Sequence, residues 1–135
     1  MQRKRQERLN RLYVEERKRL LPLTRREVFL SGLFLYWGEG SKGNNRLVSI
    51  SNTDPRIIKF ALYWMVNCLD IPLSKLRVYL HLYQDMNIEN ELYFWSKELN
   101  IPRSQFSKPY IKPTRRTNID YKGYGHGTCD LGCGN

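Results

Sequence analysis

The sequence predicts an α+β domain in which a mixed or antiparallel sheet carries helices on one face, preceded by a basic helical arm. Apolar residues recur at helical spacing over residues 25–38, 55–69 and 87–99. Alternating apolar and polar residues indicate short strands at 47–51 and 76–82. Helices mixed with short strands are typical of the α+β class, so we expect one sheet face to stay exposed.

The predicted arm covers residues 1–22. Residues 1–19 hold eight Lys/Arg and three Glu with a weak apolar seam. Pro22 ends this segment because proline breaks a helix, and residues 23–135 then form the domain proper. Two interpretations of the arm stay open: a solvated helix that joins the domain to something upstream, or an arm laid along phosphates.

The first helix of the domain begins at a predicted capping box. Thr24 would accept a hydrogen bond from the amide of Glu27, and the Glu27 carboxylate would reach back. From Arg25 to about Gly38 the residues are apolar on almost every side of the helix. Such a helix is buried on more than one face, so we expect it to lie between its own domain and a partner or second subunit.

The middle of the chain continues the alternation of strands and helices. Turn-forming residues at 40–45 precede the first strand, and Asp54-Pro55 supplies an N-cap and a first-turn proline for the next helix. In the strand at 76–82 successive side chains point to opposite faces. The apolar face holds Leu76, Val78, Leu80 and Leu82. The other face, which we expect to form one side of a binding groove, holds Arg77, Tyr79 and His81.

The last third of the chain is dense in positive charge and aromatic rings. We expect residues 103–116 to form an extended strand and residues 126–133 to begin another. That last strand would still need covering. We therefore expect either that a partner chain completes the fold or that the final helix of the domain is absent from these 135 residues.

Composition favours a polyanion as the partner. The net charge is +10 and the pI is about 9.7, and such a field attracts polyanions, although acidic membranes and acidic proteins also bind basic chains. No segment approaches the ~20 apolar residues of a membrane span, and the N-terminus lacks the apolar stretch of a signal peptide. Three irregularly spaced cysteines do not suggest a disulfide framework. We therefore expect a cytoplasmic protein with no membrane partner.

Gly38-Glu39-Gly40, at the end of the apolar helix, is the motif with the clearest chemical meaning. The C-terminus of a helix is the negative end of its dipole, so a carboxylate there is unfavourable. Burying it would cost several kcal/mol without a compensating cation or donors. Metal binding explains the position because the ion offsets both the charge and the dipole. The alternative is that Glu39 caps a turn or pairs with Lys42.

At this motif the sequence resembles the LAGLIDADG homing-endonuclease family, specifically its compact bacterial and archaeal members with a single motif. The residues from Gly32 to Gly40 match the motif helix, with Glu39 in the place of the motif's Asp. Ser51–Pro55 resembles the "NSDP" turn, and Phe94–Phe106 resembles the "FWS…LGIPxxQF" run. His126–Cys129 resembles a late "HGTC" strand. The four matches occur in the family's order and span roughly residues 24–130.

The resemblance implies a LAGLIDADG endonuclease-like fold and a DNA-binding protein that hydrolyses phosphodiesters with Mg²⁺. Glu39 and Gly38 would form the metal site, with Lys108 or Lys112 as the cation that stabilises developing charge. Because only one acidic motif is present, paired carboxylates require a homodimer, whose two-fold symmetry matches a near-palindromic duplex. The implied interface residues are Gly32, Leu35 and Gly38. The implied DNA-binding residues are Lys42, Arg46, Arg77, Tyr79, His81, Gln105, Lys108, Tyr110, Lys112, Arg115 and Arg116.

Two other functions stay open. A catalytically silent relative would bind DNA as a regulator, and a small RNA-binding protein would also explain the basic and aromatic content. Zinc is not expected, because Cys129 and Cys133 have only His126 nearby and a closed tetrahedral site lacks a fourth ligand. His81 on a strand is more often a surface histidine than a catalytic base.

Overall fold

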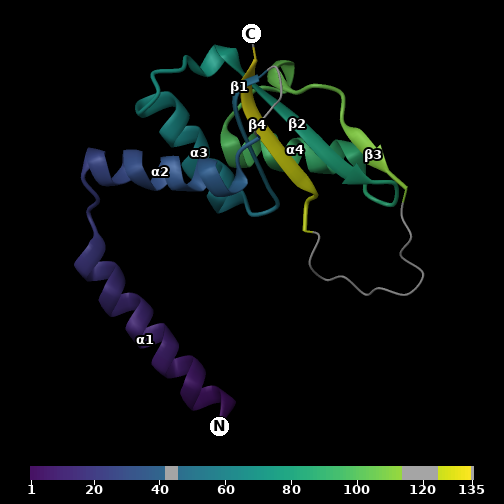
Figure 1. Ribbon diagram of the computed structural model, residues 1–135. Helices are drawn as coiled ribbons and strands as arrows, with labels where there is room; N and C mark the ends of the chain where they lie inside the picture. The colour runs from purple at the N-terminus through teal and green to yellow at the C-terminus, as the bar shows by residue number, and fades with distance from the viewer. Residues whose placement is uncertain (42–45, 114–124, 135) are drawn as a thin grey trace.

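The computed structural model describes residues 1–41, 46–113 and 125–134 (Figure 1). The helices and strands of these residues follow in the order α1 (Gln2–Leu20), α2 (Arg25–Glu39), β1 (Arg46–Asn52), α3 (Pro55–Asn67), β2 (Leu76–Tyr83), α4 (Ile88–Leu99), β3 (Tyr110–Lys112) and β4 (Thr128–Gly134). This is an α+β architecture, as predicted. None of the described helices combines the length and the apolar character that a membrane span needs.

The strands form one four-stranded mixed sheet in the order β1-β4-β2-β3. The last strand in sequence, β4, lies between β1 and β2 and pairs antiparallel with both. The short β3 pairs parallel with β2 at the edge. The sheet is therefore mixed, and its central pairings join residues far apart in the chain.

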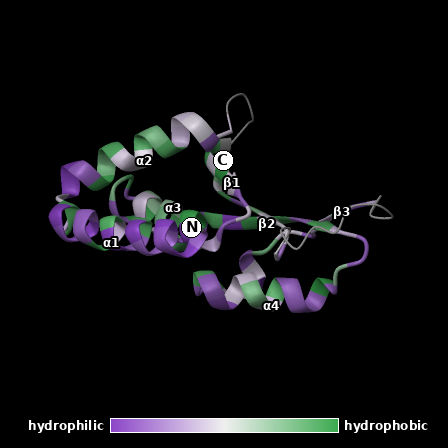
Figure 2. Ribbon diagram, turned by 90° about the horizontal axis from the view of Figure 1, so that it is seen from below, coloured by the Kyte–Doolittle hydropathy of each residue, from purple (hydrophilic) through white to green (hydrophobic). Residues whose placement is uncertain are grey.

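One face of the sheet is sealed by α3 and α4, which pack beside each other. In β2 the alternation is as predicted: Leu76, Val78, Leu80 and Leu82 are buried, and the residues between them are not. In Figure 2 α4 runs along this side of the sheet, and among the described helices none covers β2 and β3 on the other side. We call that other side the open face.

Helix α2 is fixed to α3 by the packing of Trp64 against Gly32. The predicted capping box is present, with the Glu27 amide donating to the Thr24 hydroxyl and the Thr24 amide donating to the Glu27 carboxylate. One turn further on, the indole of Trp64 lies against Gly32 and its N–H donates to the Phe29 carbonyl at 3.1 Å. A Cβ at Gly32 would lie 2.1 Å from that indole, so the contact requires glycine.

The outward side of α2 carries exposed apolar side chains. Phe34 and Trp37 are 67% and 68% exposed, and their rings stack on each other at 6.3 Å. Within α2, Gly32 alone is fully buried. Cover for the second face of α2 by a partner or a second subunit therefore stays a prediction. A monomeric surface rarely leaves such a row of large apolar side chains uncovered without an interaction role.

The entry to β4 is held against α4 by a ring stack and two hydrogen bonds. The His126 ring stacks on Phe94 with centroids 3.5 Å apart, and its Nδ1 lies 2.7 Å from the Glu91 carboxylate. The Trp95 indole donates to the His126 carbonyl at 2.8 Å. Gly127 follows at φ +78°, a conformation that favours glycine. The "FWS" and "HGTC" motifs thus meet in space and form one structural contact.

The prediction of a continuous strand over residues 103–116 is wrong where the structure describes it. Arg103–Gln105 is a 3₁₀ turn, and only Tyr110–Lys112 pairs as a strand. The turn follows Pro102, whose fixed φ suits the start of a helical turn. Gln105 holds it in place, because its side-chain amide donates to the carbonyls of Leu73 and Leu76 at 2.7 and 2.9 Å.

Replacing Gly32 with Ala is expected to lower the free energy of unfolding by about 1–3 kcal/mol, because the new methyl group meets the Trp64 indole. Gly38→Ala in the same helix is the matched control. No atom lies within 4 Å of a Cβ there, so alanine should be neutral or raise stability by up to about 1 kcal/mol. Denaturant unfolding of both variants measures this. Equal effects of the two substitutions would show that the Trp64 indole does not pack against Gly32.

Candidate functional site

The open face carries aromatic and basic side chains in a row across β2 and β3. The rings of Tyr79 and His81 lie 4.9 Å apart edge to face, and His81 lies 5.7 Å from Tyr110, its register partner on β3. Tyr110 is 49% exposed. We call Tyr79, His81 and Tyr110 the aromatic row. Its rings are arranged by the sheet itself, because alternation and parallel register place all three on one face.

Glu39 is brought to the edge of this face by the turn that ends α2. After Glu39 the chain passes closely over the Tyr36 ring, and a Cβ at Gly40 would lie 2.3 Å from that ring. Gly40 then forms a bridge with Ile50 of β1, and the Ser41 amide donates to the Ser49 carbonyl at 3.0 Å. The two glycines flanking Glu39 therefore serve different ends: Gly40 permits the close turn, while the space around Gly38 is open.

A hollow of about 570 Å³ lies between the end of α2 and the open face. We call it the acidic hollow. It is lined by Glu39, Gly40, Ser41, Ser51, Tyr79, His81 and Asp130. Three of the residues singled out from the sequence, Glu39, Tyr79 and His81, are thus brought to one place by elements far apart in the chain. In the described part of the chain no hydrogen bond or ion pair engages the exposed carboxylate of Glu39.

Asp130 is a second carboxylate in the acidic hollow, and sequence analysis missed it. It stands opposite Tyr79 on β2 and Ser51 on β1, and it accepts a hydrogen bond from the Ser51 hydroxyl at 2.8 Å. The strand at 126–133 was predicted, and its alternation with Cys129 and Leu131 could have placed Asp130 on the polar face. Its neighbours could not be predicted, because they depend on β4 entering between β1 and β2.

The charge state of His81 is set by its surroundings. Partial burial lowers the pKa of His81 below its ordinary value of 6.5, the nearby Lys112 lowers it further, and the Asp130 carboxylate opposes both. His81 is therefore neutral at pH 7 and can donate and accept hydrogen bonds at its two ring nitrogens. We therefore expect the charge of Lys112 to act on the acidic hollow.

The other residues predicted to bind DNA are spread more widely. Arg77 lies on the open face of β2, but its guanidinium donates to the carbonyls of Ser74 and Leu76. Gln105 is occupied in the 3₁₀ turn, and Lys108 is exposed on the segment before β3 without lining the acidic hollow. Arg46 begins β1. Lys42, Arg115 and Arg116 lie outside the described residues.

The predicted interface residues do not form one outward surface. Gly32 faces Trp64 of its own chain, and Leu35 packs partly against its own core. Gly38 is exposed. An interface on α2 would instead use the exposed side chains of Phe29, Leu30, Leu33, Phe34 and Trp37.

The carboxylates that line the acidic hollow are of the donor type that hard divalent cations bind. Glu39 and Asp130 supply carboxylates, the donor type that Mg²⁺ prefers, and Mg²⁺ commonly uses one or two carboxylates together with phosphate oxygens of a substrate. Within residues 1–41, 46–113 and 125–134 no three His, Cys, Asp or Glu side chains are grouped to hold a metal. Cys129 and Cys133 are buried in the core, and burial, with the Asp130 carboxylate, raises the pKa of the Cys129 thiol.

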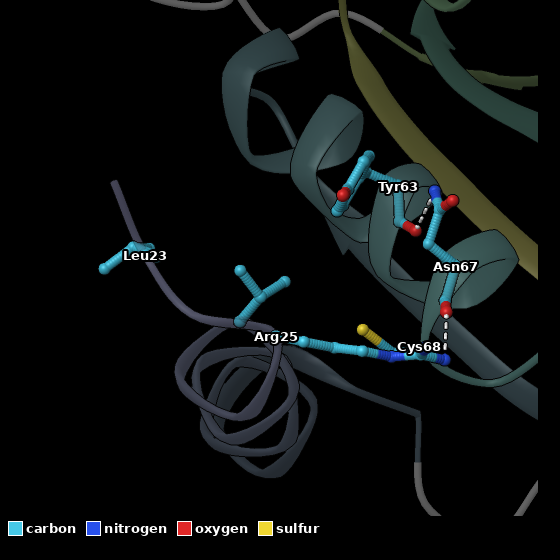
Figure 3. A pocket seen from close by; sticks show the side chains of 6 residues that line it. Leu23, Arg25, Tyr63, Asn67 and Cys68 are labelled. Carbon is cyan, nitrogen blue, oxygen red and sulfur yellow. Dashed lines mark hydrogen bonds between the residues drawn. The ribbon is translucent and has the colours of Figure 1, made fainter. Parts of the chain in front are cut away.

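A second hollow, of about 260 Å³, lies where the start of α2 meets the end of α3 (Figure 3). Its one charged side chain is Arg25, whose guanidinium donates to the Asn67 carbonyl at 3.3 Å, and Asn67 in turn donates to the Tyr63 carbonyl. Cys68 lines the same space. These contacts join the two helices and present no grouping of reactive side chains.

Comparison of the chain with protein-family models, with curated proteins and with solved structures finds no match.

In an NMR titration, the pKa of His81 is expected below 6.5. Lys112→Gln should raise it, because a neighbouring positive charge disfavours the imidazolium, and Asp130→Asn should lower it, because a stabilising carboxylate is lost. Opposite shifts in the two variants would confirm that both charges act on the acidic hollow. A wild-type pKa at or above 6.5 would contradict the arrangement.

Proposed function

We propose that this protein binds duplex DNA across the open face of its sheet. The observation that carries the proposal is the asymmetry of the sheet: α3 and α4 seal one face, while the other presents the aromatic row beside Arg77 and Lys112. Partly exposed basic and aromatic side chains, on a sheet face that no described helix covers, suit a partner that carries both negative charge and stacked bases. The β3 edge of the sheet, with β2 beside it, would lie toward the major groove, which is about 12 Å wide.

We further propose that the acidic hollow hydrolyses a phosphodiester of the bound DNA. The resemblance to the LAGLIDADG endonucleases at Gly38-Glu39-Gly40 supports this, as does the position of Glu39, exposed and without a partner among the described residues. Glu39, aided by Asp130, would hold Mg²⁺, which supplies polarisation of the scissile phosphate and a more acidic water. Lys112 contributes positive charge at the phosphate, and neutral His81 can accept a proton from water.

The working form in this proposal is a homodimer joined through the outward side of α2. A single chain offers Glu39 once, whereas two copies related by a two-fold axis would face both strands of a near-palindromic site. The exposed apolar residues of α2 include Phe34 and Trp37. The segment between Leu30 and Gly38 has no charged residue. Such a surface suits an isologous contact, in which each copy uses the same residues.

Glu39→Gln is expected to reduce Mg²⁺-dependent nicking of a randomised duplex library by at least about 100-fold, because the cation loses a charged ligand. Duplex affinity should stay within about threefold of wild type, since phosphate contacts supply most of the binding free energy. A filter-binding assay beside the nicking assay measures both quantities.

Three outcomes separate the alternatives. If wild type binds duplex DNA but cuts nothing with Mg²⁺ or Mn²⁺, the protein is a DNA-binding regulator and the hydrolysis proposal fails. If Glu39→Gln cuts as well as wild type, Glu39 is not the metal ligand. If single-stranded RNA competes better than duplex DNA across a salt series, the aromatic row stacks on unpaired bases and both DNA proposals fail.

Phe34→Glu is expected to weaken self-association by at least about 100-fold, because each copy loses a buried apolar side chain worth about 1.5–3 kcal/mol and an isologous contact loses it twice. Tyr93→Glu on α4 is the control, since Tyr93 is similarly exposed at 62% but lies on another helix. Sedimentation at micromolar concentration measures the change. A wild-type chain that remains monomeric would remove the paired site.

A further inference from the structure

Helix α1 is unusual because none of its residues is buried. All 19 residues are exposed, including Tyr13 at 68% and Leu20 at 65%. In Figure 1 it extends away from the rest of the molecule beyond the start of α2. Its stabilising contacts are local, such as the Arg3–Glu7 and Arg19–Glu16 ion pairs. Most of the stability of a helix in a protein comes from tertiary packing, so a binding partner would stabilise α1.

Basic side chains predominate on one side of α1. At 3.6 residues per turn, four basic side chains fall within about 80° of one another around the helix. They are Lys4, Arg8, Arg11 and Lys18. We call them the basic stripe. In the described part of the chain none of the four takes part in an ion pair. Glu15 falls within the same arc, and Arg19, which pairs with Glu16, lies beside it, whereas Arg3 and Arg17 lie on a different side.

The opposite side of α1 is too polar for a membrane or for a buried helix contact. Leu9, Tyr13 and Leu20 share it, but Glu16, Gln2 and Gln6 fall on the same side. A helix that lies in a membrane interface needs a continuous apolar face. The basic stripe is therefore the feature of α1 that would select a partner. It favours a partner that carries many negative charges.

The basic stripe is long enough to extend past many phosphates of a nucleic-acid backbone. From Lys4 to Lys18 the helix rises about 21 Å, a length over which duplex DNA carries about a dozen phosphate charges. We propose that α1 is a second nucleic-acid contact, separate from the open face, and that it lies along phosphates through the basic stripe. This inference builds on the proposed DNA binding, and it assigns a role to the arm that the acidic hollow does not need.

The test compares two variants of equal charge in the full chain. Arg8→Gln with Arg11→Gln removes half of the basic stripe, whereas Arg3→Gln with Arg17→Gln removes the same charge from another side of α1. Glutamine keeps the helix propensity of arginine, and far-UV circular dichroism checks that both variants fold. The measured quantity is the slope of log K against log[NaCl] for a random-sequence duplex, which changes by about 0.9 for each phosphate contact.

The stripe variant should reduce the slope by nearly two, and the control should leave it unchanged. Equal loss in both variants would show that only the net charge of α1 matters, and no loss in either would show that α1 does not touch the duplex. Tighter binding to vesicles of equal phosphatidylserine and phosphatidylcholine than to the duplex would also overturn the proposal.

Lys108→Gln with Lys112→Gln on the domain proper separates this proposal from the proposed function. If this variant reduces the slope and the stripe variant does not, the arm proposal fails alone. If the stripe variant reduces the slope and the domain variant does not, the open face is not the binding surface while the arm proposal stands. If wild type binds no duplex at all, both fail.

Discussion

The position of the acidic hollow depends on the packing of the Trp64 indole against Gly32. Trp64 belongs to α3, which seals the sheet, and Gly32 belongs to α2, which ends in Glu39. Because the indole also donates to the Phe29 carbonyl, both the depth and the rotation of α2 against α3 are set. The turn at Gly40 then reaches the edge strand β1, and Glu39 is presented to the open face. A shift of α2 along α3 would move the carboxylate away from Asp130 and His81.

The local features were predictable from the sequence, and the long-range pairings were not. The capping box at Thr24, the N-cap at Asp54 and the alternation in β2 are all present as predicted, because each depends on residues a few positions apart. The site residue Asp130 was missed, because its neighbours come from two strands on either side of β4. The 3₁₀ turn at Arg103–Gln105 was also missed, since the bonds of Gln105 reach back about 30 residues.

The motifs that resemble the LAGLIDADG family divide into structural and chemical ones. Three of the four have packing or hydrogen-bonding roles: the Asp54 amide donates to Asn52, the Ser96 hydroxyl donates to the Ile101 carbonyl, and His126 stacks on α4. Gly38-Glu39-Gly40 differs because its carboxylate has no structural partner among the described residues. The three structural motifs therefore relate to packing within the domain. The proposed hydrolysis depends on Glu39.

In the proposed function the open face, rather than the helix-covered face, contacts the DNA. Amide chemical-shift mapping during titration with a short duplex tests it directly, because each face has its own resonances. If the open face contacts the DNA, we expect the largest shifts at Tyr79 to Tyr83, Tyr110 to Lys112 and Thr128 to Asp130. The amide resonances of α3 and α4 should stay nearly unchanged. Shifts concentrated on α3 and α4, with β2 unaffected, would contradict it.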